Sequence, residues 1–583
     1  MKGAIQMSNL ENYMKQQAIF CEQNDSISKN LYSEYGVKRG LRDEKGQGVL
    51  TGLTNISDIK AFEYHDGVKS PCDGELSYRG YNIKDLVTGS KGKRFVFEEG
   101  AYLLLFGELP TDTQLMEFQG RLSDCMELPT NFTRDVIMKA PTSDIMGSMT
   151  RSILTLGSYD KEKESLEIPN VLRQSMQLIA AFPMLAVYAY HAYCHYEKNE
   201  SMYIHRPEKD LSIAENFLRL LRPDTKFTEL EARVLDIALL LHMEHGGGNN
   251  STFTTRVVTS SGSDTYSVIS AAMSSLKGKK HGGANLMVMN MMDDIKSHVK
   301  DYEDEEEIAS YLSKILKKEA FDQKGLIYGM GHAVYSISDP RERVFKGFVE
   351  QLARDKGREK DMTLYNNIEK IAPKLIAKQR QIFKGVSPNI DFYSGFVYDM
   401  LNIPRELYTP LFAIARIAGW SAHRLEELIT TDKIIRPAYK SLVSKKEYIE
   451  REERKSINVE SIFEFVERTD YLFLYSIKEC VEKSDCHEGV YLSEVAEYMK
   501  LSIPETSKMV KSLENKGYII WKLDEKKERT YLVLTNKAIE LSNCQKEKMI
   551  EAYEKIISNI QEDDLAVTRC TLRKIRQLME EIK

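Results

Sequence analysis

The sequence is poor in the features that mark secreted, redox and nucleotide-binding proteins. Its eight cysteines are scattered at positions 21, 72, 125, 194, 480, 486, 544 and 570, without a Cys-x-x-Cys pair. This scatter argues against a disulfide framework and predicts reduced thiols in a cytoplasmic protein. Residues 1–17 lack the apolar core of a signal peptide. Nothing in the sequence indicates a Walker loop, a dinucleotide fingerprint, a serine nucleophile, a metal site or a bound cofactor.

Long apolar runs and an excess of one charge are also missing. Residues 176–194 form the one run that resembles a membrane span, but Gln177, Pro183 and His191 interrupt it, which favours a helix buried in a core or subunit interface. The formal net charge of −6 argues against a surface devoted to nucleic acid, although a local basic patch stays compatible with it. The 583 residues, of which 42% are hydrophobic, predict a globular chain of about two to four domains.

What is present is organised around the motif GKKHGGAN at residues 278–285. A helical run ends at Gly278 and a second begins at Ala284, so His281 is expected in the turn between two helices. Near a helix N-terminus the end dipole favours a neutral imidazole, which can donate a hydrogen bond to a substrate carbonyl. The alternative is a structural histidine in a glycine turn.

Two further glycine turns carry histidines. A capping box at residues 228–231 starts a helix that ends before GGG at 246–248, which places His242 and His245 on one helical face. Zinc binding by this pair is an alternative, but no carboxylate or cysteine stands at a fitting offset. His332 follows a second glycine turn at 325–331.

The remaining candidates are charged side chains in apolar surroundings. Asp391 is expected in the first turn of a helix capped by Asn389, either as a helix-dipole aspartate or as a carboxylate base. Arg416 lies in the apolar run 411–420 and must either extend to water or meet an anion.

Together these residues predict one kind of chemistry. Arg341, Arg416 and Arg436 suit a small substrate with more than one carboxylate, because a guanidinium binds carboxylate in a bidentate manner. Carbonyl-polarising histidines and a carboxylate base suit removal of a proton next to a carbonyl, followed by attack of the enol on a second carbonyl.

The motifs that carry these residues, in this order, resemble the citrate synthase family. They are GELSYRGYNI, FEEGAYLLLFGELP, EHGGGNNSTFTTR, KHGGANLMV, GMGHAVYSISDPR, PNIDFYSG, ARIAGW and IIRPAY. After an N-terminal extension over residues 1–35, the resemblance implies a mostly α, two-domain fold over residues 36–450, consistent with the helical spacing of the apolar residues. Within it, a small subdomain at about 285–400 should close over oxaloacetate before acetyl-CoA reacts.

The resemblance also implies a role for each residue. His281 should bind the thioester carbonyl of acetyl-CoA, Asp391 should take its methyl proton, and His332 should polarise the ketone of oxaloacetate. Carboxylates of oxaloacetate or citrate should be held by His245, Arg341, Arg416 and Arg436. Arg436 reaches in from a partner subunit in this family, so a homodimer is implied. Coenzyme A should lie against Gly325, Leu326, Ile327, Tyr328 and Gly329, and no cofactor is needed beyond this thioester substrate.

There are departures from the family pattern. Many relatives read Asp-His-Glu where this chain has Glu244, His245 and Gly246. Lys279 and Lys280 replace small or proline residues before His281; they either meet a phosphate of coenzyme A or form a solvated pair.

Beyond a charged linker at 451–460, residues 461–583 resemble the α+β winged helix-turn-helix domain of MarR-type regulators. That resemblance implies DNA contacts from Thr506, Ser507, Lys508 and Lys511, and from Lys526 and Arg529 on the wing. However, the aspartate of the family's wing motif is lost, and residues 491–545 hold nine Lys or Arg against eight Asp or Glu. A regulatory, ligand-sensing or dimer-stabilising module is therefore favoured over DNA binding.

Three functions follow as hypotheses. The first is a citrate synthase, the second is a 2-methylcitrate synthase that uses propionyl-CoA, and the third is a transcriptional regulator that senses metabolites with an enzyme fold. The complete catalytic set favours an enzyme, because a sensor would not need Asp391. No membrane partner is expected.

Overall fold

The computed structural model divides the chain into two compact units, Met1–Ala438 and Tyr439–Lys583. The structure describes residues 13–15, 17–19, 21–22, 25–43, 47–66, 68–332, 334–335, 337–380, 385–451, 466–481, 484, 489–524 and 528–557. Nearly all of the predicted linker 451–460 lies outside these ranges, as do residues 461–465 and 558–583 of the predicted C-terminal domain.

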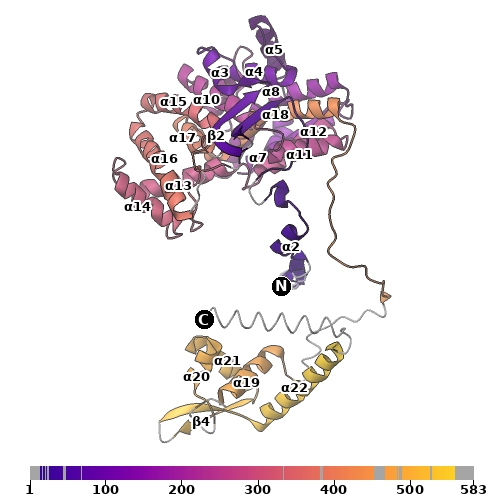
Figure 1. Cartoon of the computed structure of the whole chain (residues 1–583), viewed down its shortest axis with the longest axis vertical. Coiled ribbons are helices and arrows are strands. Elements are labelled where there is room, and N and C mark those ends of the chain that lie inside the picture. The colour runs from indigo at the N-terminus through magenta and orange to yellow at the C-terminus, as the bar shows by residue number, and fades with distance from the viewer. Residues whose placement is uncertain are drawn as a thin grey trace. The chain divides into compact units, whose positions relative to one another are not determined.

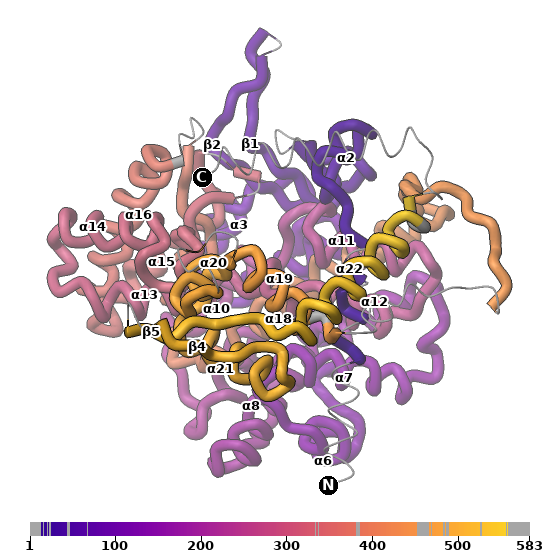
Figure 2. Tube along the Cα trace, turned by 90° about the horizontal axis from the view of Figure 1, so that it is seen from below, coloured from indigo at the N-terminus to yellow at the C-terminus, as the bar shows by residue number. Residues whose placement is uncertain are grey.

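A small antiparallel sheet follows the first helices of unit 1. After α2 (Lys29–Glu34) and the 3-10 helix η1 (Arg39–Leu41) come β1 (Ser57–His65), β2 (Val68–Tyr78) and β3 (Tyr81–Asn82), paired in that order. β1 and β2 form a hairpin whose tip projects from the body of the unit (Figure 2). At its base the Tyr78 hydroxyl donates to the carbonyls of Leu240 (3.0 Å) and Glu244 (3.1 Å), which fixes the sheet beside the end of α10.

Helices form most of the rest of unit 1, as the spacing of its apolar residues predicts. In chain order the first set is α3 (Ile83–Gly89), α4 (Val96–Phe106), α5 (Asp112–Asp124), α6 (Phe132–Asp135), η2 (Ile137–Lys139), α7 (Ile145–Tyr159), α8 (Ile168–Lys198), α9 (Ile213–Leu221), α10 (Glu229–His242), α11 (Asn250–Ser260) and α12 (Thr265–Lys277). The chain of helices ends with η3 (Arg405–Leu407) and α18 (Tyr408–Thr430). α18 packs against α4, α8, α10 and α11 near the centre of the unit (Figure 1).

The apolar run 176–194 lies inside α8 and is largely buried, so the prediction of a buried helix is confirmed. In the described ranges, no helix combines the length and the apolar character that crossing a membrane would require.

Five helices between residues 284 and 400 pack mainly on one another. They are α13 (Ala284–His298), α14 (Glu305–Leu316), α15 (Pro340–Asp355), α16 (Glu359–Arg380) and α17 (Ile390–Met400). α14 packs on α16, while α13 and α15 pack on α17, and Figure 1 shows the group along one side of unit 1. α15 also contacts α3, α10 and β2, which joins the group to the rest of the unit. The group spans nearly the range predicted for the small subdomain, and both that division and its closure stay predictions.

Unit 2 has a hydrophobic core of its own. Its elements are α19 (Arg468–Val481), α20 (Leu492–Met499), α21 (Ile503–Asn515), β4 (Ile519–Asp524), β5 (Arg529–Leu534) and α22 (Asn536–Ile557). β4 and β5 form the predicted hairpin, and Val490 adds a bridge to Leu532. Ser502 and Glu505 form the capping box that starts α21. The buried side chains of this core include Phe473, Ile477, Val495, Val510 and Leu532.

Candidate active site

His281 lies in the turn between α12 and α13, as the sequence predicts. The backbone N–H groups of His281 and Gly282 donate to the Gly278 carbonyl (2.8 and 3.1 Å), and a Cβ on Gly282 would lie 2.2 Å from the Leu276 oxygen, so the turn requires glycine there. The ring Nε2 accepts the backbone N–H of Ser251 (3.3 Å). A neutral ring therefore carries its proton on Nδ1. Burial and the nearby Arg416 lower the pKa of His281 to about 4, which keeps it a neutral hydrogen-bond donor.

His332 has the opposite tautomer. Its Nδ1 accepts the backbone N–H groups of Val334 (2.9 Å) and Tyr335 (3.3 Å), so the proton of the neutral ring is on Nε2. Burial and Arg341 lower its pKa to about 4. Two neutral imidazoles thus present one N–H each, through different ring nitrogens.

The loop before His332 is tied to the helix that carries Asp391. The Gly331 N–H donates to the Ser387 carbonyl (2.7 Å), and the Asn389 N–H donates to the Gly329 carbonyl (2.9 Å). Gly329 and Gly331 have positive φ (79° and 85°). A Cβ on Gly329 would also lie 2.9 Å from Phe392 of α17, so this close approach needs glycine.

Asp391 lies in the first turn of α17, where Asn389 accepts its backbone N–H at 3.0 Å, so the predicted N-cap is confirmed. The residue as a whole is half-buried, while its carboxyl group is desolvated. Burial raises its pKa to about 6, although Arg341 and Arg416 act in the other direction. A helix dipole alone would lower the pKa, so burial dominates here; the role of Asp391 as a carboxylate base stays a prediction.

Arg341 and Arg416 are both buried but differ in their partners. Arg341 donates through Nε (3.0 Å) and Nη2 (2.7 Å) to Asp339, which also accepts the Ile390 N–H of α17 (3.2 Å). Burial opposes the charge of Arg341, but Asp339 raises its pKa above the ordinary value. This pair joins the start of α15 to the helix of Asp391.

Arg416 is completely buried in the middle of α18 and does not extend to water. Its Nε donates to the His242 carbonyl (2.7 Å), its guanidinium lies 4.6 Å from the ring centre of Phe412, and its Nη1 has no hydrogen-bond partner among the described residues. Burial lowers its pKa to about 10, so it stays charged at neutral pH. A buried cation with an unpaired donor is what an anionic ligand would complete.

These groups form one cluster. The imidazoles of His245 and His332 lie 5.1 Å apart, and Arg416 acts electrostatically on His245, His281 and Asp391. Burial, together with Arg341 and His332, lowers the pKa of His245 well below its ordinary value.

Sequence reasoning missed Tyr335 and gave His242 and Glu244 no part in holding a substrate. Tyr335 approaches His245 Nε2 with its hydroxyl (3.2 Å) and contacts the ring of His332. His242 is buried with neither ring nitrogen hydrogen-bonded in the described structure, and Glu244 is completely buried. Within the sequence, the position of Tyr335 in the motif of His332 was the one available indication. Among the described residues, no group of three or more His, Cys, Asp or Glu side chains could hold a metal ion.

Other predicted residues lie apart from this cluster. Arg436 is exposed in the segment 431–450, outside any helix or strand. In the predicted coenzyme loop, Gly325, Ile327 and Gly329 are buried, Leu326 is exposed and Tyr328 donates to Asp322 (2.6 Å). Lys279 and Lys280 are exposed.

In unit 2, Ser507, Lys508 and Lys511 are exposed on α21, whereas Thr506 is buried and donates to the Ser502 carbonyl (3.0 Å), so the prediction that it contacts DNA is wrong. Arg529 lies over the Tyr491 ring (4.7 Å), and Lys526 lies outside the described residues.

Comparisons with known proteins agree with this arrangement. A family model described as the citrate synthase C-terminal domain matches residues 44–438. The citrate synthase of Synechocystis sp. is 36% identical over 392 residues, covering 66% of this chain and 89% of its own. The 2-methylcitrate synthase of Shewanella oneidensis is 34% identical over 364 residues, covering 62% of this chain and 87% of its own.

Solved structures give the same result. The ternary complex of carboxymethyl coenzyme A and oxaloacetate with the citrate synthase of Thermoplasma acidophilum has a TM-score of 0.59 at 26% identity, covering 71% of this chain and 99% of its own. The citrate synthase of Pyrobaculum aerophilum has a TM-score of 0.57 at 28% identity, covering 70% of this chain and 95% of its own. Fold and site together define an acyltransferase-type enzyme. The chain belongs to the citrate synthase family.

Proposed function

We propose that the protein is a citrate synthase, which condenses acetyl-CoA with oxaloacetate and water to give citrate and coenzyme A. The observation that carries the proposal is the guanidinium of Arg416, buried with an unpaired Nη1 beside two neutral imidazole donors and a carboxyl group with a raised pKa. An anionic substrate with a carbonyl group satisfies all of these groups at once.

In this mechanism Asp391 takes a proton from the methyl group of acetyl-CoA, while the Nδ1–H of His281 donates to the thioester carbonyl and stabilises the enol. The enol carbon attacks the ketone carbon of oxaloacetate, and the Nε2–H of His332 donates to the oxygen on which negative charge develops. Water then hydrolyses the citryl thioester to citrate and coenzyme A. Desolvation around the two histidines strengthens both hydrogen bonds in the transition state.

Three groups of the cluster hold the carboxylates of oxaloacetate. Arg416 offers Nη1, and Arg341 offers Nη1 as well, because its Nε and Nη2 are used by Asp339. His245 lies beside His332 and contributes a third contact. No cofactor takes part, since the thioester itself activates the methyl group.

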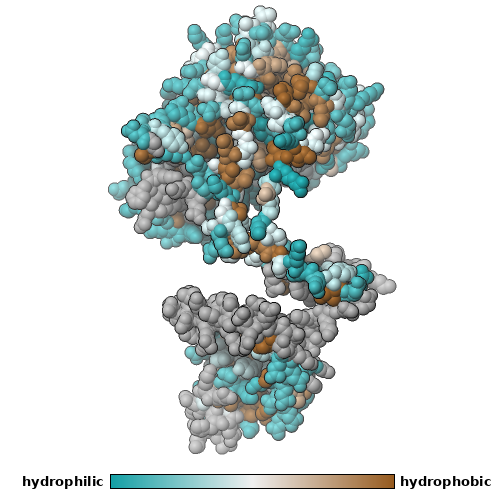
Figure 3. All heavy atoms as spheres, turned by 45° about the vertical axis from the view of Figure 1, so that its right-hand side comes forward, coloured by the Kyte–Doolittle hydropathy of each residue, from teal (hydrophilic) through white to brown (hydrophobic). Residues whose placement is uncertain are grey.

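A homodimer supplies the fourth group, Arg436. The segment that carries it exposes large apolar side chains, with exposed fractions of 66% for Ile434, 94% for Tyr439 and 69% for Val443. Apolar side chains also gather on the visible face of unit 1 (Figure 3). Such a segment is unfavourable in water and suits burial against a second copy, which brings Arg436 to its site.

The competing proposal is a 2-methylcitrate synthase, and relatives with both names are similarly distant, at 36% and 34% identity. One added methylene changes the preference by only about 1–3 kcal/mol. Release of coenzyme A thiol from acetyl-CoA and from propionyl-CoA, each with oxaloacetate, separates them. We expect acetyl-CoA to have the higher kcat/KM; a higher value for propionyl-CoA would assign the second activity, and no release from either would exclude both. Cys21, Cys72, Cys125, Cys194 and Cys544 form no disulfide among the described residues, which supports the cytoplasm as the site of this reaction.

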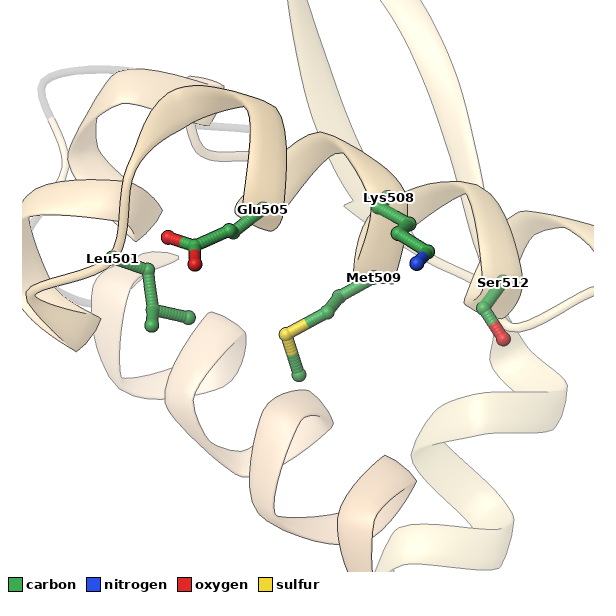
Figure 4. A pocket seen from close by; sticks show the side chains of 5 residues that line it. All are labelled: Leu501, Glu505, Lys508, Met509 and Ser512. Carbon is green, nitrogen blue, oxygen red and sulfur yellow. The ribbon is translucent and has the colours of Figure 1, made fainter. Parts of the chain in front are cut away.

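Unit 2 is, in this proposal, a winged-helix module that regulates the enzyme. The order of α20, α21, the β4–β5 hairpin and α22 supports the winged helix. The outer face of α21 mixes charges and apolar groups around a hollow of about 470 Å³, lined by Leu501, Glu505, Lys508, Met509 and Ser512. Figure 4 shows Leu501 and Met509 pointing to the same side of the helix. This face suits a regulatory contact better than the phosphates of DNA.

A further inference from the structure

A network of buried charged side chains leads away from the substrate cluster. It begins at Glu244, which precedes His245, and continues through His423, Arg256, Glu426 and Glu427, all of them at most 9% exposed. None of these five was assigned a role above. A buried charge destabilises the fold unless an opposite charge or hydrogen bonds compensate it, so the partners of each residue in this network indicate its role.

The carboxylate of Glu244 uses one oxygen for three hydrogen bonds. Oε1 accepts from the Ser57 hydroxyl (2.9 Å), the Gly246 N–H (2.6 Å) and His423 Nε2 (2.9 Å). Oε2 has no hydrogen-bond partner among the described residues. The Gly246 bond fixes the peptide that follows His245, and the Ser57 bond reaches to the first residue of β1.

The hydrogen bonds of His423 determine which ring nitrogen carries the proton. Its Nδ1 accepts hydrogen bonds from Nε (3.1 Å) and Nη2 (2.7 Å) of Arg256, and a guanidinium has only donors, so Nδ1 carries no proton. The proton is on Nε2 and is donated to Glu244. Arg256 in turn pairs with Glu426 and with Glu427 (2.8 Å).

Ser57, Gly246 and His423 are thus the direct donors to Glu244. Glu244 is in addition the strongest opposite charge acting on Arg416. Gly419, one turn after Arg416 in α18, leaves room for this arrangement, since a Cβ there would lie 2.6 Å from Glu244 Oε2 and 2.3 Å from the Met243 oxygen.

The far end of the network, at Glu426, is hydrogen-bonded to the segment before β1. Glu426 Oε1 accepts the Asn55 N–H (2.6 Å), and Glu244 accepts the Ser57 hydroxyl. Residues 55 to 57 therefore bind to both ends of the network.

We propose that Glu244 is a positioning residue for oxaloacetate: it fixes the His245–Gly246 peptide and lies against α18 one turn from Arg416, and residues 55–57 hold it in place. The proposal rests on the function proposed above. Because the hydrogen bonds of Glu244 within the described structure go to Ser57, Gly246 and His423 and not to His281, His332 or Asp391, we expect it to act on oxaloacetate affinity and not on the chemical step.

The test is Glu244→Gln in the full chain, which keeps the side-chain volume and removes the charge. We expect the KM for oxaloacetate to rise about tenfold or more, with kcat within about threefold and the KM for acetyl-CoA unchanged. Calorimetric titration of oxaloacetate should show the same loss without turnover. Glu244→Asp, which restores the charge, should recover part of it, and Ser57→Ala should raise the KM by a smaller factor.

Glu231→Gln is the matched control. Glu231 is also a buried carboxylate, but it pairs with Arg222 (2.6 Å) and Lys356 (2.7 Å). The Glu231→Gln variant should have a lower Tm and an unchanged KM for oxaloacetate. If Glu244→Gln behaves like this control, Glu244 is merely structural and the proposal is overturned.

Should Glu244→Gln not fold, Glu244→Asp decides, because it withdraws the carboxylate by one methylene; an unchanged KM for oxaloacetate in that variant contradicts the proposal. Failure of the proposed function looks different. Wild-type protein would then neither bind oxaloacetate nor release coenzyme A.

Discussion

The substrate cluster of unit 1 and the outer face of α21 in unit 2 both carry conspicuous charged residues, but their environments are opposite. Arg416 is 0% exposed, has an Nη1 donor without a partner among the described residues, and acts on a carboxylate whose pKa is raised to about 6. Lys508 and Lys511 are exposed to water. Water can satisfy the donors of the two lysines, whereas it does not reach the guanidinium of Arg416.

The difference shows where a function can be inferred. A buried, unpaired charge destabilises the fold and persists only where something else compensates it, so it points to a ligand. An exposed lysine is solvated by water, so its charge does not destabilise the fold and does not by itself indicate a ligand. The predictions below test this contrast, in order of expected effect.

The largest effect is expected from Asp391→Asn. It should lower kcat about a thousandfold or more because the base is lost, while calorimetry should find oxaloacetate affinity nearly unchanged. Since burial raises the pKa of Asp391 from the ordinary 3.8 to about 6, its ionised form destabilises the fold as pH rises through that range. The variant should therefore have a higher Tm than wild type at pH 7. Equal loss of affinity and turnover would make Asp391 structural instead.

Next comes Arg416→Leu, which should raise the KM for oxaloacetate about a hundredfold. The control is Arg424→Leu in the same helix. Arg424 is equally buried, but it donates to Thr259 (3.2 Å), Thr265 (3.2 Å) and the Ser263 carbonyl (2.9 Å). The Arg424→Leu variant should have a lower Tm and an unchanged KM for oxaloacetate. Similar kinetics in the two variants would remove Arg416 from the substrate site.

The pH profile is a third test. Asp391 must be ionised to act, so kcat/KM should rise about tenfold per pH unit below pH 6 and level off above it. His281 and His332, with pKa values of about 4, are neutral throughout that range and should add no second step. A profile that falls between pH 5 and 7 would mean that a histidine acts in its charged form.

The smallest effect is expected in unit 2. The double variant Lys508→Ala, Lys511→Ala should leave coenzyme A release unchanged, and the wild-type chain should give no salt-dependent shift of duplex DNA. A DNA shift at low salt that the double variant abolishes would show that the exposed lysines bind DNA. That result would support the sensor hypothesis.

Local sequence patterns predicted much of this structure. The turn of His281 between two helices, the Asn389 cap of α17 and the Ser502–Glu505 box depend on neighbours in sequence, so short-range rules suffice for them. The chemistry of the site was also inferred from residue types, because three arginines with a carboxylate and neutral histidines limit the possible substrates.

What depends on distant contacts was not predictable. The tautomer of His281 is set by the N–H group of Ser251, 30 positions away in sequence, and that of His423 by Arg256, 167 positions away. In the sequence Glu244 was a departure from the family pattern, and only packing against α18 reveals its place close to Gly419, one turn from Arg416. The burial of Thr506 likewise depends on how α21 packs, which its position in the sequence did not disclose.

Citrate synthase activity can be tested by incubating the purified full chain with oxaloacetate and acetyl-CoA labelled in both acetyl carbons, and identifying the products by mass spectrometry. We expect citrate that carries both labelled carbons, formed only when both substrates are present and in equal amount to the coenzyme A released. Coenzyme A release that does not depend on oxaloacetate, or the absence of any labelled condensation product, would contradict this expectation.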